Sequence, residues 1–214
     1  MINIIASGSK GNAIIYHKEI LVDVGVAYKH IEPYLDEVKY ILLTHIHIDH
    51  YKPKIIKRIQ KNYPHIQILG GEWFADKVTD LFVINCNTWY QLEGYQISAF
   101  DVYHDVENVG YRIFKELPDF EHHKLIHVTD TYSLDGVEAV GYDLYCVEHN
   151  HYEDIINQAI AEKQMRGVFA YEVNARDNHM SYERAESWLK LNNTNNAEVI
   201  KLHISTKNGV IKDE

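Results

Sequence analysis

The chain has few cysteines, no long apolar run and a deficit of positive charge. Only two of its 214 residues are cysteines, Cys86 and Cys146, and they lack the spacing of a thiolate metal site. This usage suits a reducing compartment, and we expect a cytoplasmic protein. Lys and Arg number 21 against 31 Asp and Glu, and the net charge of −10 speaks against a broad basic surface for nucleic acid.

Membrane segments and domain linkers are also missing from the sequence. No stretch approaches the roughly 18 apolar residues of a membrane span, and residues 1–7 carry no signal-peptide pattern. We therefore expect no membrane partner. No internal repeat, low-complexity segment or Pro/Gly/Ser-rich linker divides the chain. With 46% apolar residues, we expect a single domain over residues 1–214.

Short apolar runs alternate with helical stripes along the chain. Helices are expected from near Pro53, over residues 153–165 and after Ser181, which suits a helix N-cap. Residues 168–172 fit either a short strand or a turn. Strands are expected at 3–6, 13–16, 20–24, 39–44, 66–69, 81–84, 96–102, 110–114, 124–128, 143–147 and 198–202. This order predicts layered sheets with helices outside.

Histidine is the abundant chemical group, with 14 residues. Four metal-capable side chains follow the apolar run 41–43 within six residues, in the pattern His45-Ile46-His47-Ile48-Asp49-His50. Imidazole and carboxylate are the ligands that zinc prefers after thiolate. In an extended chain His45 and His47 project to the same side and can reach one ion, while Asp49 and His50 can serve a second.

Three further metal-ligand types stand at the ends of apolar strands, namely His104, Asp130 and His203. Together with the cluster at 45–50 they complete a set for two metal ions. We interpret the other histidines outside any motif as surface or structural residues, namely His17, His30, His65, His122, His123 and His127.

The order of these seven residues resembles that of the metallo-β-lactamase-fold hydrolases. The flanking motifs resemble the YycJ-type branch, which is related to tRNase Z and RNase J, and they run from residue 7 to about 205: residues 7–12, 21–25, 104–105, 109–111, 129–131, 148–151 and 179–181. The resemblance implies an α/β fold, a four-layer αββα sandwich with the site at one edge of the two sheets.

The resemblance also implies a ligand set. It places Asp23 as a support of the metal loop and Asn12 near the site. Two divalent ions are expected, Zn²⁺ first, with Mn²⁺ also compatible with nitrogen and oxygen ligands. They would be held by His45, His47 and His104 (first ion), by Asp49, His50 and His203 (second ion) and by Asp130 (bridging).

The implied activity is that of a binuclear metal-dependent phosphodiesterase, in which a metal-activated hydroxide attacks phosphorus in line. Asp49 would help to orient the hydroxide. His179 is the first candidate for assisting the leaving group, as its match does in phosphodiesterase relatives. His151 and Glu148 are further candidates, either as catalytic groups or as supports that orient a ligand.

The substrate stays open at this level. The YycJ-type resemblance implies a nuclease acting on DNA or RNA ends, whereas the net acidity and the lack of a long inserted arm favour a small cyclic nucleotide. Thioester or lactone hydrolysis on the same fold is a third class, which the His179 and Glu148 motifs disfavour. Aromatic residues near the motifs either pack in the core, which is the commoner role, or stack on a base, namely Tyr51, Trp73, Phe74 and Tyr132. Beyond the phosphodiester substrate, the sequence leaves open whether the chain forms a homodimer.

Overall fold

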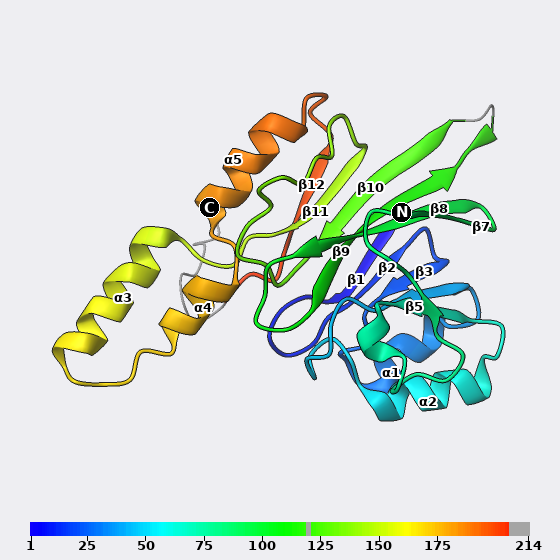
Figure 1. The fold of residues 1–214 in the computed structure, drawn as a ribbon, viewed down its shortest axis with the longest axis horizontal. Helices are drawn as coiled ribbons and strands as arrows, with labels where there is room; N and C mark the ends of the chain where they lie inside the picture. The colour runs from blue at the N-terminus through cyan, green and yellow to red at the C-terminus, as the bar shows by residue number, and fades with distance from the viewer. Residues whose placement is uncertain (119–120, 206–214) are drawn as a thin grey trace. The chain divides into compact units, whose positions relative to one another are not determined.

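The computed structural model describes residues 1–118 and 121–205. The chain divides into two compact units, Met1–Thr88 and Trp89–Glu214, and each contains one sheet (Figure 1). Within the described residues, no helix is long and apolar enough to cross a membrane.

The first unit is built on a six-stranded sheet whose strands follow chain order. Strands β1 to β3 pair antiparallel, and β3 to β6 pair parallel. The strands are β1 (Ile2–Ala6), β2 (Ala13–Tyr16), β3 (Ile20–Val22), β4 (Tyr40–Leu42), β5 (Gln67–Gly70) and β6 (Phe82–Val83). The helical segments are α1 (Tyr28–Ile31), η1 (Glu32–Tyr34), α2 (Pro53–Asn62) and η2 (Glu72–Phe74).

Helix α2 shows why this sequence folds as it does. Pro53 occupies the first turn, where its missing N–H costs nothing, and Ile56 and Ile59 are fully buried on one side of the helix. They join a core that includes Leu21 of β3 and Ile41 of β4. Strand β4 is buried on both faces, as its unbroken apolar run predicts.

In the second unit the described residues form a six-stranded sheet in the order β12-β11-β10-β9-β8-β7. Strands β7 to β10 pair antiparallel, and β10 to β12 pair parallel. The strands are β7 (Trp89–Leu92), β8 (Tyr95–Val102), β9 (Asn108–Glu116), β10 (His122–Val128), β11 (Leu144–Glu148) and β12 (Glu198–Leu202). The helices are α3 (Glu153–Met165), α4 (Glu172–Asn178) and α5 (Tyr182–Asn192).

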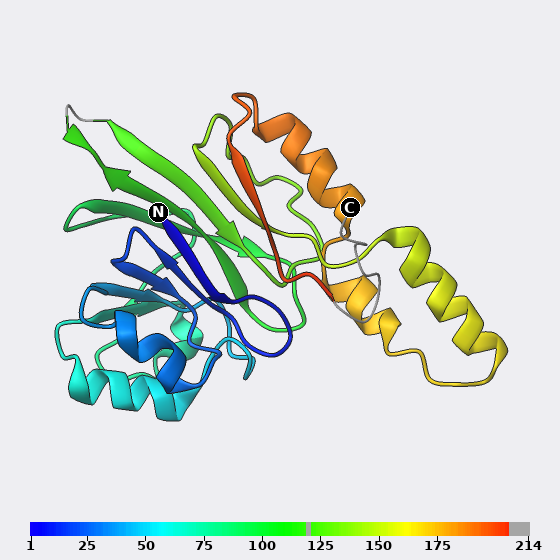
Figure 2. The same cartoon turned by 180° about the vertical axis from the view of Figure 1, so that it is seen from behind.

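Helix α5 lies along the β11–β12 side of this sheet, whereas α3 and α4 extend away from it as a hairpin (Figure 2). Ser181 caps α5 as predicted, since its hydroxyl accepts a hydrogen bond from the backbone of Arg184. Ala185 and Trp188 then pack into the core of the sheet. The hairpin has a small apolar cluster of its own around Ile156 and Ile160.

The structure corrects several sequence predictions. Residues 168–172 contain no strand, and Glu172 begins helix α4, which the sequence did not predict. Strand β7 was also not predicted. The strand expected at 20–24 ends at Val22, because Asp23 adopts a left-handed φ of 61° that no strand can continue. The helices expected at Pro53, at 153–165 and after Ser181 are confirmed.

Three loops of the first unit are tied together where Gly25 crosses Asp49. The backbone of Asn12 donates to the carbonyl of Asp49 at 2.6 Å, Gly25 donates to the carbonyl of Asn12 at 2.8 Å, and Val24 donates to the carbonyl of His50 at 2.8 Å. A Cβ on Gly25 would lie 1.6 Å from the Asp49 carbonyl oxygen. Only glycine permits this close approach.

We predict that Gly25→Ala lowers the free energy of unfolding by about 3 kcal/mol or more, because the Asp49 backbone must move to admit the methyl group. Urea denaturation followed by circular dichroism measures the change. Gly94→Asn is the control, since Gly94 has a left-handed φ of 76° with nothing within 4 Å, and asparagine tolerates that conformation. A Gly25→Ala variant as stable as the native chain would contradict the close packing at Asp49.

Candidate metal centre

The histidine-loop cluster, which we define as Asp23, His45, His47, Asp49 and His50, lies directly after strands β3 and β4. Strand β4 lies between β3 and β5 in the parallel part of the sheet, and it sends the chain out at the carboxyl edge. A turn follows in which the N–H groups of His50 and Tyr51 both donate to the carbonyl of His47, at 2.9 and 2.7 Å. The sheet thereby fixes the position of the backbone that carries the ligand-type side chains.

Asp23 holds this cluster in place through hydrogen bonds to Thr44 and His50. Its carboxylate accepts hydrogen bonds from the Thr44 backbone at 2.9 Å, from the Thr44 hydroxyl at 2.9 Å and from His50 Nδ1 at 2.6 Å. The side chain is buried, and this burial raises the pKa of the Asp23 carboxyl despite the opposing effects of His50 and Thr44. Asp23 is therefore a positioning residue for the loop, as the family resemblance implied.

These hydrogen bonds select the ring tautomers. His50 Nδ1 donates to Asp23, so His50 Nε2 is unprotonated and carries a lone pair. This Nε2 atom lies 2.7 Å from the Asn12 amide nitrogen. The Thr44 hydroxyl donates to Asp23 and therefore accepts from His45 Nδ1 at 3.0 Å. His45 Nε2 is then also a lone-pair nitrogen, as a metal ligand must be.

The spacing of the ring nitrogens fits a metal ion. His45 Nε2 and His47 Nδ1 face each other at 3.2 Å. Two nitrogens bound to tetrahedral zinc at about 2.0–2.1 Å lie roughly 3.3–3.4 Å apart, so the pair is set at almost the separation that zinc requires.

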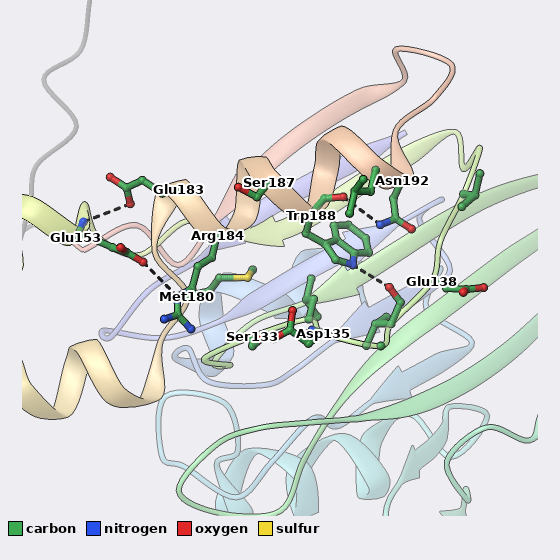
Figure 3. A pocket seen from close by; sticks show the side chains of 15 residues that line it. Ser133, Asp135, Glu138, Glu153, Met180, Glu183, Arg184, Ser187, Trp188 and Asn192 are labelled. Atoms are coloured by element: carbon green, nitrogen blue, oxygen red, sulfur yellow. Dashed lines mark hydrogen bonds and ion pairs between the residues drawn. The ribbon is translucent and has the colours of Figure 1, made fainter.

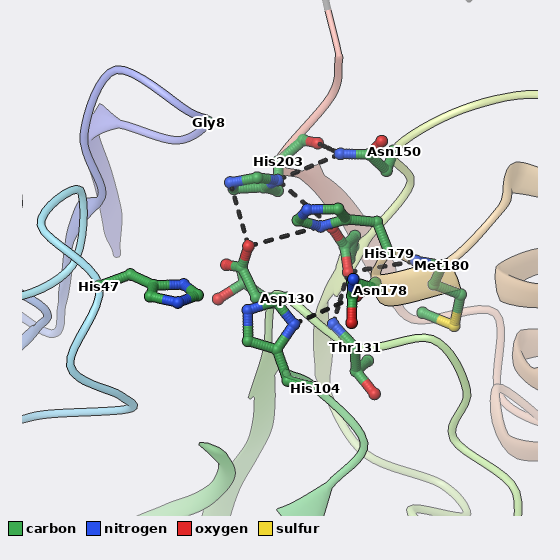
Figure 4. Close-up of polar contacts among 12 residues, drawn as sticks. Gly8, His47, His104, Asp130, Thr131, Asn150, Asn178, His179, Met180 and His203 are labelled. Carbon is green, nitrogen blue, oxygen red and sulfur yellow. Dashed lines mark hydrogen bonds and ion pairs between the residues drawn. The ribbon is translucent and has the colours of Figure 1, made fainter. Parts of the chain in front are cut away.

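The strand-end cluster, which we define as Asp130, Glu148, His179 and His203, belongs to the second unit. Figure 4 labels Asp130, His179 and His203. Strands β10, β11 and β12 are adjacent and parallel, so their carboxyl ends share one edge of the sheet. Asp130 follows β10, Glu148 ends β11 and His203 follows β12. Asp130 and His203 have left-handed φ values of 55° and 51°, which turn the chain sharply at the strand ends.

One ligand atom from each of the four side chains lies within 4.8 Å of the other three. Asp130 Oδ1 is 3.4 Å from both His203 Nε2 and His179 Nδ1. Glu148 Oε1 is 2.7 Å from His179 Nδ1 and 3.3 Å from His203 Nδ1. The rings of His179 and His203 stack at 5.0 Å with a tilt of 10°. Asp130 and His203 offer ligand atoms that suit a divalent metal, whereas Glu148 and His179 face each other.

Glu148 and His179 form a charged pair inside the protein. Burial of Glu148 favours its neutral form, but the charge and hydrogen bond of His179, with a hydrogen bond from His203, hold its pKa below the usual value. Burial likewise opposes the charge on His179, but Glu148 outweighs it and raises the pKa of His179. The pair therefore consists of a carboxylate and an imidazole that retains its proton more readily than free histidine.

His179 is held beside Glu148 by the chain on either side of it. It caps the end of α4, and Met180 donates its N–H to Glu148 at 3.3 Å. The next residues run beside the segment that follows β11, since Asn150 donates to the carbonyl of Met180 at 2.9 Å and Tyr182 donates to that of His151 at 2.8 Å. These contacts on both sides fix the position of His179, a candidate that its motif predicted.

His104 lies next to the strand-end cluster. It follows β8, its Nδ1 donates to the carbonyl of Asn178 at 3.2 Å, and its ring meets that of His179 edge-on at 5.7 Å. Burial lowers the pKa of His104, which favours the neutral form that binds metal. His151 lies beyond the cluster, buried, with Nδ1 3.3 Å from Asn150 Oδ1.

Several supporting residues were not foreseen from sequence, and two of the named aromatic residues lie in the core. The Asn150 amide donates to the carbonyl of His203 and lies 3.2 Å from its Nδ1, and Asn108 donates to the carbonyl of Asp130. Only the place of Asn150 inside a quoted motif hinted at such a role. Tyr51 and Phe74, expected as base-stacking candidates, pack in the core of the first unit and cannot reach a ligand.

Comparison with known proteins supports the fold through structure alone. No protein-family model matches the sequence, and no curated protein matches it. Human tRNase Z in its short form matches with a TM-score of 0.70 and 16% identity over 96% of this chain and 92% of that chain. The metallo-β-lactamase fold protein YhfI from Bacillus subtilis matches with a TM-score of 0.68 and 18% identity, covering 95% and 85% of the two chains.

A long-form RNase Z from yeast also matches, with a TM-score of 0.63 and 13% identity over 96% of this chain but only 37% of that chain. The chain therefore has the metallo-β-lactamase fold, and the sequence-based prediction of that fold is confirmed. Among solved structures it resembles tRNase Z proteins as well as metallo-β-lactamase-fold proteins at large.

We predict that Asp23→Asn weakens binding of Zn²⁺ by ten- to a hundredfold, because an amide accepts fewer hydrogen bonds and no longer holds His50 in its ligating tautomer. Competition with a zinc chelator dye measures the affinity. His65→Gln, which changes an exposed histidine of the same unit, is the control and should bind zinc as the native chain does. Native affinity in Asp23→Asn would remove Asp23 from the support of the site.

Proposed function

We propose that the protein is a metal-dependent hydrolase that cleaves phosphodiester bonds at nucleic acid ends. The observation that carries the proposal is the strand-end cluster, in which the charged Glu148–His179 pair adjoins the ligand-type side chains of Asp130 and His203. The structural matches to proteins named tRNase Z and RNase Z support a nuclease on this fold.

We assign the ligands of two divalent ions, Zn²⁺ or Mn²⁺, from the family resemblance of the sequence. They are His45, His47 and His104 for one ion, Asp49, His50 and His203 for the other, and Asp130 as a bridge. When bound, such ions lower the pKa of water and neutralise charge on phosphoryl oxygens.

The protein's own groups supply orientation and a proton. Asp23 and Thr44 hold the ligand tautomers of His50 and His45. Glu148 accepts the Nδ1 proton of His179 and stabilises the charged ring, which leaves the Nε2 proton available to a departing alkoxide. Asp49 is partly exposed at the end of its loop, where we propose that it orients the attacking water.

Two other substrates compete with a nucleic acid end. The net charge of −10 favours a small cyclic nucleotide, because a long polyanion is repelled by an acidic surface. Thioester or lactone hydrolysis is less favoured, because the buried Glu148–His179 pair suits protonation of a poor alkoxide leaving group.

One panel tests the proposal. We expect zinc- or manganese-loaded protein to hydrolyse linear DNA or single-stranded RNA as well as bis(p-nitrophenyl) phosphate, and a chelator or Asp49→Ala to reduce turnover by at least a hundredfold. Metal content is measured on the same samples, so that loss of metal is distinguished from loss of chemistry.

If the protein hydrolyses 3′,5′-cyclic nucleotides and the artificial diester but does not degrade polymers, the nuclease proposal is wrong and the activity is that of a cyclic nucleotide phosphodiesterase. Well under one metal ion per chain, with activity unchanged in Asp49→Ala, would refute the metallohydrolase.

We predict that His179→Ala slows release of a nucleoside alkoxide by about 10²- to 10⁴-fold and release of p-nitrophenolate far less, because p-nitrophenolate leaves without a proton. The measurement is kcat for an oligonucleotide and for bis(p-nitrophenyl) phosphate. An equal decrease in kcat with both substrates would show that His179 is not the proton donor.

A further inference from the structure

A small cavity of about 120 Å³ adjoins the strand-end cluster on the side of His179. It lies where α3, α4 and α5 meet, and its volume equals that of roughly four waters, enough for a phosphate group. The residues that line it are Tyr132, His151, Glu153, Asn157, Arg176, His179, Ser181 and Arg184.

Arg184 is fixed in this cavity by its neighbours. Its Nη2 donates to the Tyr132 hydroxyl at 2.6 Å, its Nε donates to Glu153 Oε1 at 3.1 Å, and the guanidinium lies 3.9 Å over the Tyr132 ring. Such packing removes most of the side-chain freedom that binding would otherwise cost. Tyr132, one of the base-stacking candidates, stacks on this arginine.

Arg176 supplies a second guanidinium from α4. Within the described residues its side chain makes one ion pair, from Nε to Asp177 Oδ1 at 2.8 Å. A guanidinium has five N–H donors, and the contacts seen here use one in Arg176 and two in Arg184. Two arginines with donors to spare are the arrangement that binds phosphate.

His151 provides an independent sign of a ligand. It is only 3% exposed, lines the cavity, and its Nε2 meets no hydrogen-bonding group among the described residues. Burial lowers the pKa of His151 to about 4, so the ring is neutral at pH 7. Since Nδ1 donates to Asn150 Oδ1, Nε2 is an acceptor, which suits a hydroxyl group.

The neighbouring larger cavity has the opposite charge. It measures about 900 Å³ and shares Arg184 and Glu153 with the smaller one (Figure 3). Its other charged lining residues are Asp135, Glu138 and Glu183, which would repel a phosphate. The anionic part of a ligand is therefore directed into the smaller cavity.

We propose that the cavity at Arg176 and Arg184 binds a phosphate on the leaving-group side of the scissile phosphodiester, with His151 accepting a sugar hydroxyl of the same nucleotide. This inference rests on the proposed function, because it takes His179 as the proton donor. A group beyond the leaving oxygen must lie beside that donor, and His179 lines both the cluster and the cavity.

The cavity then selects the substrate. Binding energy from a phosphate one nucleotide away orients the leaving group over His179 and raises the rate of cleavage. A 3′,5′-cyclic nucleotide has no second phosphate and gains nothing from the two arginines. The cavity therefore favours a nucleic acid end, through a local cationic site in an acidic protein.

The kinetic test uses the ribodinucleotides ApA, pApA and ApAp with the metal-loaded full chain. We expect the dinucleotide that carries its extra phosphate on the leaving nucleoside to have a kcat/KM about tenfold above that of ApA. In Arg176→Gln the two kcat/KM values should become equal. Arg166→Gln removes the same charge from an exposed position at the end of α3 and should leave the ratio unchanged. Equal kcat/KM for all three dinucleotides in the native protein would overturn the proposal.

A binding test separates this inference from the proposed function. Calorimetry measures the Kd of adenosine 3′-monophosphate, adenosine 5′-monophosphate and adenosine. For the monophosphate that the native chain binds more tightly, Arg176→Gln should raise Kd about tenfold, whereas Arg166→Gln should leave Kd unchanged. If no diester is hydrolysed but this loss is found, the proposed function fails and the phosphate cavity stands. If Arg176→Gln binds both monophosphates as the native chain does, the cavity assignment fails whatever the turnover.

Discussion

A buried carboxylate that accepts hydrogen bonds from imidazole rings sets the arrangement of histidines in each unit. Asp23 holds His50 and, through Thr44, the tautomer of His45. Glu148 does the same for His179 and His203. Buried charge is costly unless it is paired, so these carboxylates and rings stabilise each other and lose their freedom together. Ring nitrogens are thereby oriented before any metal binds.

Backbone strain at the strand ends serves the same purpose. Asp23, Asp130 and His203 adopt left-handed φ, which costs a non-glycine residue about 1–2 kcal/mol each. Every one of them follows a strand closely and turns a ligand-type or supporting side chain at the sheet edge. The hydrogen bonds of the carboxylates and the parallel pairing of β10 to β12 hold these turns in place.

Local sequence was sufficient for the fold and for much of the candidate site. The apolar run before His45, the stripe of α2 and the cap at Ser181 are short-range signals, and each produced the expected element. Residues that act through long-range packing could not be foreseen. Helix α4 has the weak helix formers Asn174, Asp177 and Asn178 and depends on packing against α3. Sequence alone could not decide whether Tyr51 stacks on a base or packs in the core, because its contact with Phe74 joins residues far apart in the chain.

The two arginines of the cavity show the same limit at a functional level. Arg176 and Arg184 come from different helices, and neither stands in a recognisable motif. The net charge of −10 predicts that the protein repels polyanions, yet charge acts locally once a ligand is within about a Debye length, near 8 Å in physiological salt. A fixed guanidinium pair beside His179 can therefore select a phosphorylated leaving group while the acidic surface disfavours unspecific binding along a nucleic acid. On this reasoning the acidity of the chain distinguishes ends from interiors, and it does not argue against a nucleic acid substrate.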